Sequence, residues 1–334
     1  MINIIMSGLR SCNGRCAYCA IKNFVHNNDF EFQYDWDKLK ETLDNYIEKD
    51  NEYFIWGADP VVSYNSFKKT VSFLREYNPN CVIHTSTNGS TLTDEVIEYL
   101  NSNDIHLQLS HDGIAEELKL PFDPILKYNI QNINHLYINC VINYYNYNIP
   151  KNIEYFEKNT KDIYISFSLP QFGINYSNKL NTTGFFNGEY REDLINKPFG
   201  DMDIHGEAVE PLIGYCAALL YNNKTRYILN VPTDEYFIDY RKSVPLNAVC
   251  CLSAWRGLNK GNNIDTLGNY TQCNLLDSLR EKKEMRRNEL CNKCKYRYSA
   301  LCGMCYLQEP VTYCNFRYRL NMMLEGLTNN KENI

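Results

Sequence analysis

Short apolar runs and amphipathic segments alternate along the first half of the chain. Six runs are rich in β-branched or aromatic residues and are bounded by polar or turn-forming residues, which predicts strands. The segments between them space apolar residues three or four positions apart, which predicts helices. The expected strands cover residues 2–8, 52–57, 81–87, 105–110, 135–143 and 162–168. The expected helices cover residues 36–49, 63–77, 91–102, 123–132 and 151–159.

This alternation implies successive βαβ units and therefore a parallel sheet. Six units predict an α/β fold, a (β/α)6 partial TIM barrel over residues 1–170, with functional loops at the carboxyl ends of the strands. Residues 171–247 are less regular and are interpreted as a bridge region with a helix near 208–222. Residues 248–334 are expected to form a small cysteine-rich domain that ends in a helix.

Unusual residues follow four of the predicted strands. A segment with three cysteines, 12–19, follows the first strand, and "GADP" (57–60) follows the second. "TNG" (87–89) and "SHDG" (110–113) follow the third and fourth. Each Gly- or Pro-containing segment alone fits an ordinary turn. Because the carboxyl ends of parallel strands share one edge, we expect all four segments to meet at one rim.

The composition of the 334 residues is that of a globular protein, with 44% hydrophobic and 22% charged residues. A formal net charge of -6 argues against nucleic acid as a partner, since such binding neutralises phosphates with Lys and Arg. The basic run 280–287 is interpreted as a solvated helix face. No apolar run approaches the roughly 20 residues of a membrane helix, and no signal peptide is evident. We therefore expect a cytoplasmic protein without a membrane partner.

The expected cytoplasmic location indicates how the 14 cysteines are used. Reducing compartments disfavour structural disulfides and favour metal binding or catalysis by thiols. Cys12, Cys16 and Cys19 are spaced CxxxCxxC, so three thiolates can hold three irons of a four-iron cluster and leave the fourth iron open. Zinc is the alternative, but a structural zinc site needs four closed ligands, and no fourth Cys or His adjoins this loop.

The segment "CNGRCAYC" resembles the signature of the radical S-adenosylmethionine (radical SAM) enzymes, including the aromatic Tyr18 before the last cysteine. The resemblance implies a 4Fe-4S cluster on the three cysteines, with the open iron chelated by S-adenosylmethionine. In that family an electron from the cluster splits the sulfonium into methionine and a 5'-deoxyadenosyl radical.

Other rim segments extend the resemblance over residues 2–170. "GADP" looks like the family's GGEP motif, with Ala58 and Asp59 in place of Gly and Glu. "SHDG" looks like the strand-four segment that approaches the ribose, and "VIN" is similar to a fifth-strand segment near the adenosine. The S-adenosylmethionine contacts that the resemblance implies are Gly57, Ala58, Asp59, Pro60, Asn88, Ser110, Asp112 and Asn143.

The cysteines after residue 248 resemble those of the SPASM domain, an auxiliary-cluster module of radical SAM enzymes. Two CxxC pairs follow a Gly-x4-Cys element, although the spacing of the middle cysteines departs from the family's usual one. The resemblance implies two auxiliary 4Fe-4S clusters, and two zinc sites of four cysteines each are the alternative. The ligands of the first are Cys251, Cys273 and Cys305, with Cys250 or the substrate as the fourth. The ligands of the second are Cys291, Cys294, Cys302 and Cys314.

Three cysteines lie outside both groups. Cys81 and Cys140 fall in predicted strands and are expected to be small buried apolar residues. Cys216 falls in the bridge region, where core packing is the favoured interpretation and a role as hydrogen-atom donor is the alternative.

SPASM-type radical SAM enzymes mostly oxidise or crosslink side chains of peptides and proteins. The resemblance therefore implies hydrogen abstraction from a peptide or small-protein substrate, leading to crosslinking, oxidation or epimerisation, as in the maturation of ribosomal peptides. A small-molecule dehydrogenase and a noncatalytic metal-stapled binding protein are the alternatives. The first cluster cysteine is residue 12, which leaves no room for a preceding leader-binding domain. A leader is therefore expected to be read by a separate leader-binding protein or by the barrel itself. The expected reductant is a flavodoxin or ferredoxin.

One position bears on the type of reaction. In the sulfatase-maturing relatives an acidic base follows the cysteine of the Gly-x4-Cys element, whereas this chain has Asn274. Formylglycine formation is therefore not the expected reaction.

Overall fold

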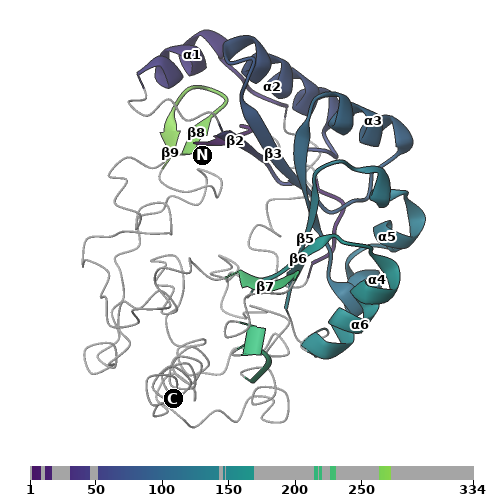
Figure 1. Ribbon diagram of the computed structural model, residues 1–334. Coiled ribbons are helices and arrows are strands. Elements are labelled where there is room, and N and C mark those ends of the chain that lie inside the picture. The colour runs from purple at the N-terminus through teal and green to yellow at the C-terminus, as the bar shows by residue number, and fades with distance from the viewer. Residues whose placement is uncertain are drawn as a thin grey trace, which may run out of the picture.

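One curved sheet organises the part of the chain that the computed structural model describes. Its nine strands lie in the order β7-β6-β5-β4-β3-β2-β1-β8-β9. Neighbouring strands run parallel except β9, which is antiparallel to β8. Helices α1 to α6 cover the convex side of the sheet (Figure 1). The described residues are 2–8, 12–16, 31–45, 52–142, 146, 148–168, 214–216, 218–219, 226–230 and 263–271.

The first six strands confirm those expected from the sequence. Two more parallel strands extend the sheet, because β7 pairs with β6 and β8 pairs with β1. They have four and three residues, which is too short for a recognisable periodicity, and the sequence predicts no strand there. The strands are β1 (Ile2–Ile5), β2 (Glu52–Trp56), β3 (Val82–Thr87), β4 (Ile105–Ser110), β5 (Leu136–Val141), β6 (Tyr164–Ser168), β7 (Tyr227–Asn230), β8 (Asn263–Asp265) and β9 (Tyr270–Thr271).

Four helices begin at polar side chains that cap them. Asp35, Thr93, Asp123 and Asn148 each accept a backbone N–H from the first turn of α1, α3, α5 and α6, respectively. The expected helix over 123–132 consists of two short pieces, α5 and η2, and the sequence predicts no helix where η1 and α4 lie. The elements are α1 (Trp36–Asp44), α2 (Tyr64–Tyr77), α3 (Asp94–Ser102), η1 (Gly113–Ala115), α4 (Glu116–Lys119), α5 (Pro124–Lys127), η2 (Ile130–Asn132) and α6 (Ile149–Asn159).

The apolar core lies between the convex side of the sheet and the helices. On β4, Leu107 and Leu109 are buried in this core, and Gln108 between them faces the concave side. Cys81 and Cys140 belong to the same core, which confirms that they are buried. Among the described helices, none combines the length and the apolar character needed to cross a bilayer.

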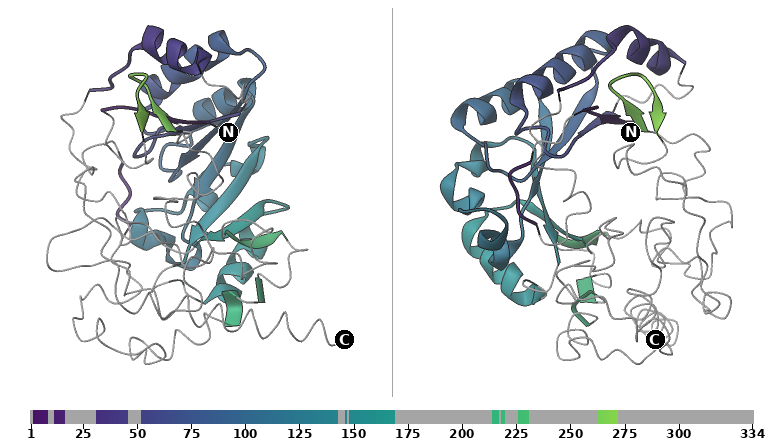
Figure 2. Two further views of the ribbon diagram at one scale, coloured as in Figure 1. Left: turned by 90° about the vertical axis from the view of Figure 1, so that its left-hand side faces the viewer. Right: turned by 180° about the vertical axis from the view of Figure 1, so that it is seen from behind.

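The β8–β9 hairpin lies beside β1, although it comes from the far end of the sequence (Figure 2). Asn3 Nδ2 donates to Asn263 Oδ1 at 2.7 Å. The Ser7 N–H donates to Thr266 Oγ1 at 2.9 Å, just after β1 ends. Residues of the predicted cysteine-rich segment therefore brace the strand that leads into the first cysteine loop.

Candidate functional site

The loop after β1 contacts the loop after β3 at the carboxyl ends of the strands. Asn88 Nδ2 donates to Asn13 Oδ1 at 2.9 Å and lies 3.6 Å from Cys12 Sγ. Ser90 Oγ donates to the same Asn13 oxygen at 2.8 Å. Two hydrogen bonds from the β3 loop therefore hold the cysteine loop in place, and Cys12 lies against Asn88 at the expected rim.

Cys12 and Cys16 direct their sulfur atoms toward the same side of Gly14. A Cβ atom added at Gly14 would lie 3.6 Å from Cys12 Sγ, 3.7 Å from Cys16 Sγ and 3.3 Å from Asn88 Nδ2. Both cysteines are partly exposed, whereas Gly14 is buried. Two accessible sulfurs that border one small space fit ligands of a shared iron-sulfur cluster. The third predicted ligand, Cys19, lies outside the described residues.

Asp59 joins the loop after β2 to the loop after β3. Its side chain is 4% exposed, and its carboxylate accepts the N–H of Asn88 at 2.8 Å and that of Val62 at 3.3 Å. Burial raises the pKa of Asp59 to about 6, although these hydrogen bonds act in the opposite direction. Asp59 therefore lies in the rim, where its oxygens hold two rim loops together.

The segment after β4 turns sharply at Gly113. This residue has a φ of +60°, and a Cβ atom there would collide with Oδ1 of Asn152 in α6, so only glycine fits. The carbonyl of the buried Asp112 accepts an N–H of Asn146 at 2.9 Å. Ser110 and Asp112, two of the predicted cofactor contacts, are thereby fixed at the end of β4.

A buried charge network lies directly behind this turn. Lys119 of α4 is 2% exposed, and its Nζ donates to the Ser110 carbonyl at 2.6 Å and pairs with Glu116 Oε2 at 3.1 Å. Asp112 Oδ1 is 3.9 Å from the same Nζ. Burial alone would lower the pKa of Lys119, but Glu116, Asp112 and Cys16 outweigh it and raise that pKa above its usual value. Lys119 is therefore an ammonium ion with its charge compensated inside the protein.

Lys119 also contacts the cysteine loop through its backbone, since its carbonyl accepts the Arg15 N–H at 2.9 Å. Lys119 is not among the site residues predicted from the sequence. The letters "EELK" are typical of a solvated helix, and only the placement of Glu116 and Lys119 three residues apart, directly after a rim motif, signals a pair. The burial of the pair depends on tertiary contacts that the local sequence does not encode.

His111 is fully buried and has partners at both ring nitrogens. The Gly113 N–H donates to Nδ1 at 3.0 Å, so the ring proton belongs on Nε2, which lies 3.0 Å from Asp123 Oδ1. The Tyr155 hydroxyl donates to the second oxygen of Asp123. Burial would raise the pKa of Asp123, but the hydrogen bonds from His111 and Tyr155 outweigh it and lower that pKa. This chain of contacts connects the rim segment to α5 and α6.

The concave side of the sheet presents polar side chains below the rim. Tyr137 OH donates to Gln108 Oε1 at 2.8 Å, and Ser168 Oγ donates to Asn139 Oδ1. The register of β4 and β5 places Ser110 beside Asn139. These amide and hydroxyl groups form an uncharged polar strip next to the predicted cofactor contacts.

The structure describes some of the remaining predicted site residues. Gly57, Ala58 and Pro60 lie in the loop beside Asp59. Cys216 is buried in the apolar core within a helical stretch, and burial raises its pKa to about 12, which favours the packing interpretation. The predicted residues that lie outside the described part of the chain are Cys19, Asn143, Cys250, Cys251, Cys273, Cys291, Cys294, Cys302, Cys305 and Cys314.

The region that contains this rim is similar to known proteins in sequence. Residues 6–165 match the family model of the radical SAM superfamily. A cysteine-type anaerobic sulfatase-maturating enzyme of Clostridium novyi (strain NT) is 25% identical over 122 residues. That alignment spans 34% of this chain and only 33% of the relative.

Solved structures resemble the fold over nearly all of the chain. The structure of anSMEcpe with bound AdoMet has a TM-score of 0.62 at 17% identity and covers 98% of this chain and 99% of that one. The same protein with AdoMet and a Cp18Cys peptide has a TM-score of 0.60 at 16% identity, with 98% of both chains covered. SuiB of Streptococcus suis has a TM-score of 0.51 at 13% identity and covers 92% of this chain and 73% of that one. The predicted partial barrel is thereby confirmed.

Proposed function

From the match of residues 6–165 to the radical SAM family model, we propose that the chain is a radical SAM enzyme, which cleaves S-adenosylmethionine reductively and modifies a peptide or small protein. The observation that carries the proposal is the arrangement of Cys12 and Cys16, whose sulfurs border one space at Gly14, against Asn88. We assign Cys12, Cys16 and Cys19 as the ligands of a 4Fe-4S cluster.

When bound, a cluster and S-adenosylmethionine would supply the radical chemistry for hydrogen abstraction from a substrate C–H bond. The chain's own residues hold the parts in place. Asn88 and Ser90 fix the cysteine loop, and Lys119 ties that loop to the end of β4. Ser110 and Asp112 are held at the same rim and are proposed to contact S-adenosylmethionine. This rigidity keeps the reacting groups oriented, which is the main contribution a protein makes to such chemistry.

A peptide substrate is supported by two observations. The polar strip of Gln108, Tyr137, Asn139 and Ser168 offers donors and acceptors that suit backbone amides. A solved relative of the same fold carries a Cp18Cys peptide. We propose crosslinking, oxidation or epimerisation as the outcome, and the presence of Asn274 argues against formylglycine formation.

Further components belong to the same proposal. The eight cysteines from Cys250 to Cys314 would hold two auxiliary 4Fe-4S clusters, which would accept an electron from the substrate radical. A flavodoxin or ferredoxin would deliver the reducing electron in the cytoplasm, and a separate protein would present the leader of the peptide.

Anaerobic reconstitution tests the proposal. Iron and sulfide are counted, and 5'-deoxyadenosine is measured with dithionite, in the wild type and in the variant with Cys12, Cys16 and Cys19 changed to Ala. We expect about twelve irons per chain, about four fewer in the variant, and no 5'-deoxyadenosine from the variant. Iron binding without cleavage of S-adenosylmethionine in the wild type would refute the catalytic function.

A sulfatase-type peptide that contains cysteine tests the reaction class. We expect no formylglycine by mass spectrometry under conditions in which the enzyme forms 5'-deoxyadenosine. Asn274→Asp serves as the comparison, because it restores an acidic side chain at that position. Formylglycine from the wild type would overturn the argument from Asn274.

A further inference from the structure

Three histidines lie side by side at the amino end of the sheet, the end opposite the rim. His106 is the second residue of β4, and the register places it beside His84 of β3. His135 directly precedes β5, and its carbonyl accepts the Leu107 N–H at 2.8 Å, so it lies on the other side of His106. Backbone pairing of parallel strands therefore aligns the three imidazoles, which we call the histidine row.

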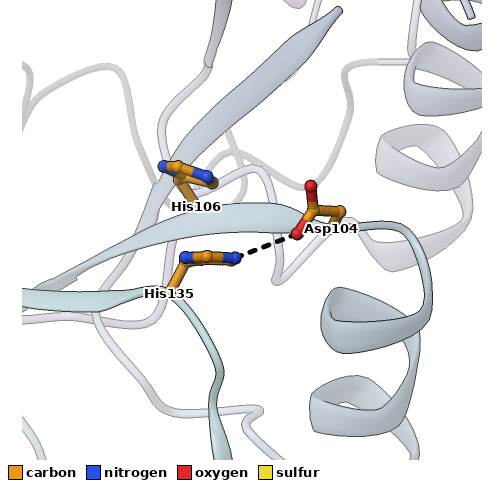
Figure 3. A group of neighbouring side chains, drawn as sticks. All are labelled: Asp104, His106 and His135. Carbon is orange, nitrogen blue, oxygen red and sulfur yellow. Dashed lines mark ion pairs between the residues drawn. The ribbon is translucent and has the colours of Figure 1, made fainter. Parts of the chain in front are cut away.

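An aspartate reaches this row from the turn before β4. Figure 3 shows Asp104 directed at His135, whose ring lies alongside that of His106. Asp104 Oδ1 is 2.9 Å from His135 Nε2. The rings of His106 and His135 are 4.2 Å apart between centroids and nearly parallel, at 17°. One ligand atom from each of the three residues lies within 4.8 Å of the others.

We propose that Asp104, His106 and His135 bind one zinc ion. Imidazole nitrogen and carboxylate oxygen form a donor set that zinc uses, whereas magnesium and calcium prefer oxygen alone. Three protein ligands leave a fourth position for water. Nothing in the proposed radical chemistry requires this site.

Binding requires a small rearrangement, and the exposure of the residues permits it. Two parallel rings cannot direct their in-plane lone pairs at one ion, so one imidazole must rotate out of the stack. The side chains of His135 and Asp104 are 44% and 74% exposed, and neither is locked by packing. The Asp104–His135 contact is an exposed ion pair, which costs little to open.

His84 is a histidine of the same row that is not a proposed zinc ligand, so its substitution serves as a control. Its ring is 4.8 Å from that of His106 and meets it edge-on, yet its nitrogens are not part of the group that converges with Asp104. His84 Nε2 is buried and has no hydrogen-bond partner among the described residues. His84→Asn therefore changes a neighbouring imidazole without removing a proposed ligand.

The site lies far from the cysteine loop along the strand. His106 and Ser110 are four residues apart on β4, which is about 13 Å at roughly 3.3 Å per residue. A zinc ion here would join the turn at Asp104 to the starts of β4 and β5. Zinc binding should therefore stabilise the amino end of the sheet. This effect on stability can be measured separately from S-adenosylmethionine cleavage.

The test uses the full chain with its iron-sulfur clusters reconstituted, dialysed against zinc. The wild type and the His106→Asn, His135→Asn and His84→Asn variants carry the same cysteines, so differences in zinc content isolate the histidine row. We expect the wild type and His84→Asn to hold one zinc ion more per chain than the other two variants. Equal zinc content in the wild type and the His106→Asn and His135→Asn variants, or loss in His84→Asn as well, would overturn the assignment.

X-ray absorption at the zinc edge of the wild type supplies a measurement that needs no variant. We expect nitrogen and oxygen neighbours at about 2.0–2.1 Å with scattering from two imidazoles. A first shell of sulfur near about 2.3 Å would place the zinc on cysteines and refute the proposed site.

Discussion

The two ends of the parallel sheet satisfy their polar groups in opposite ways. At the carboxyl end, His111, Glu116 and Lys119 are buried and interlocked with the backbone of the rim loops. At the amino end, Asp104 and His135 are exposed and pair with each other. Buried networks fix geometry because every member depends on its partners, whereas exposed pairs contribute little and can rearrange. The difference suits the two proposed roles, which are a rigid rim that holds a cluster loop and an amino end that rearranges around an ion.

Lys119→Met is the strongest way to break the buried network. The change removes the ammonium and leaves the Glu116 and Asp112 carboxylates together in the interior. Loss of one partner of a buried ion pair costs about 3–5 kcal/mol. We expect the free energy of unfolding in urea to fall by that amount.

Two variants calibrate this result. Lys158→Met removes an exposed lysine of α6, and we expect a change within about 0.5 kcal/mol. Adding Glu116→Gln to Lys119→Met should recover part of the loss, because it removes an unpaired charge and keeps an acceptor for the Asp112 N–H. Equal losses for Lys119→Met and Lys158→Met would show that the buried pair does not stabilise the rim.

Asp59→Asn tests the buried rim through the pH dependence of the free energy of unfolding. The pKa of Asp59 is raised from 3.8 to about 6 by burial, so the folded protein holds this proton more tightly than the unfolded chain. The wild type should therefore lose stability as pH rises from about 3 to about 7, by about 3 kcal/mol in all at 1.36 kcal/mol per pKa unit. Asp59→Asn does not titrate, so its stability relative to the wild type should rise by that amount over the same range in urea unfolding. A difference between the two proteins that stays constant with pH would contradict the raised pKa.

Asn88→Ala tests how the rim holds the cysteine loop. The variant loses the Nδ2 donor to Asn13 and the Oδ1 acceptor of the Ser90 N–H. At about 0.5–1.5 kcal/mol per hydrogen bond, we expect a loss of about 1–3 kcal/mol and a lower iron content after reconstitution. Ser90→Ala is the matched control, since it removes only the second donor to Asn13. A smaller effect for Asn88→Ala than for Ser90→Ala would mean that Asn88 does not position the loop.

The strands and loops that form the rim could be predicted because each strand and helix is marked by a pattern within its own segment of the sequence. Apolar periodicity located the six central strands, and Thr93 marked the start of α3. The loops after the strands then had to meet at one edge, and the contacts of Asn88 with the β1 and β2 loops confirm this for the first three.

The parts that the sequence did not predict depend on contacts between distant segments. The Glu116–Lys119 pair is polar in sequence but buried, because Ser110 and Arg15 supply its partners. Strands β7 and β8 are too short to show a pattern and form by pairing with an existing edge. The histidine row exists only through strand register, since each histidine is isolated in the sequence.

The smallest expected effect comes from His135→Asn in zinc-free protein. The change removes an exposed ion pair with Asp104, so the free energy of unfolding should fall by only about 0–1 kcal/mol. With zinc at 100 times its dissociation constant, the wild type should gain about 2.7 kcal/mol and His135→Asn should gain nothing. The free energies of unfolding without and with zinc show whether the amino end of the sheet is organised by its own side chains or by a bound ion. A zinc-free loss as large as that of Lys119→Met would show that the amino end is pre-organised like the rim, and the contrast between the two ends would then be wrong.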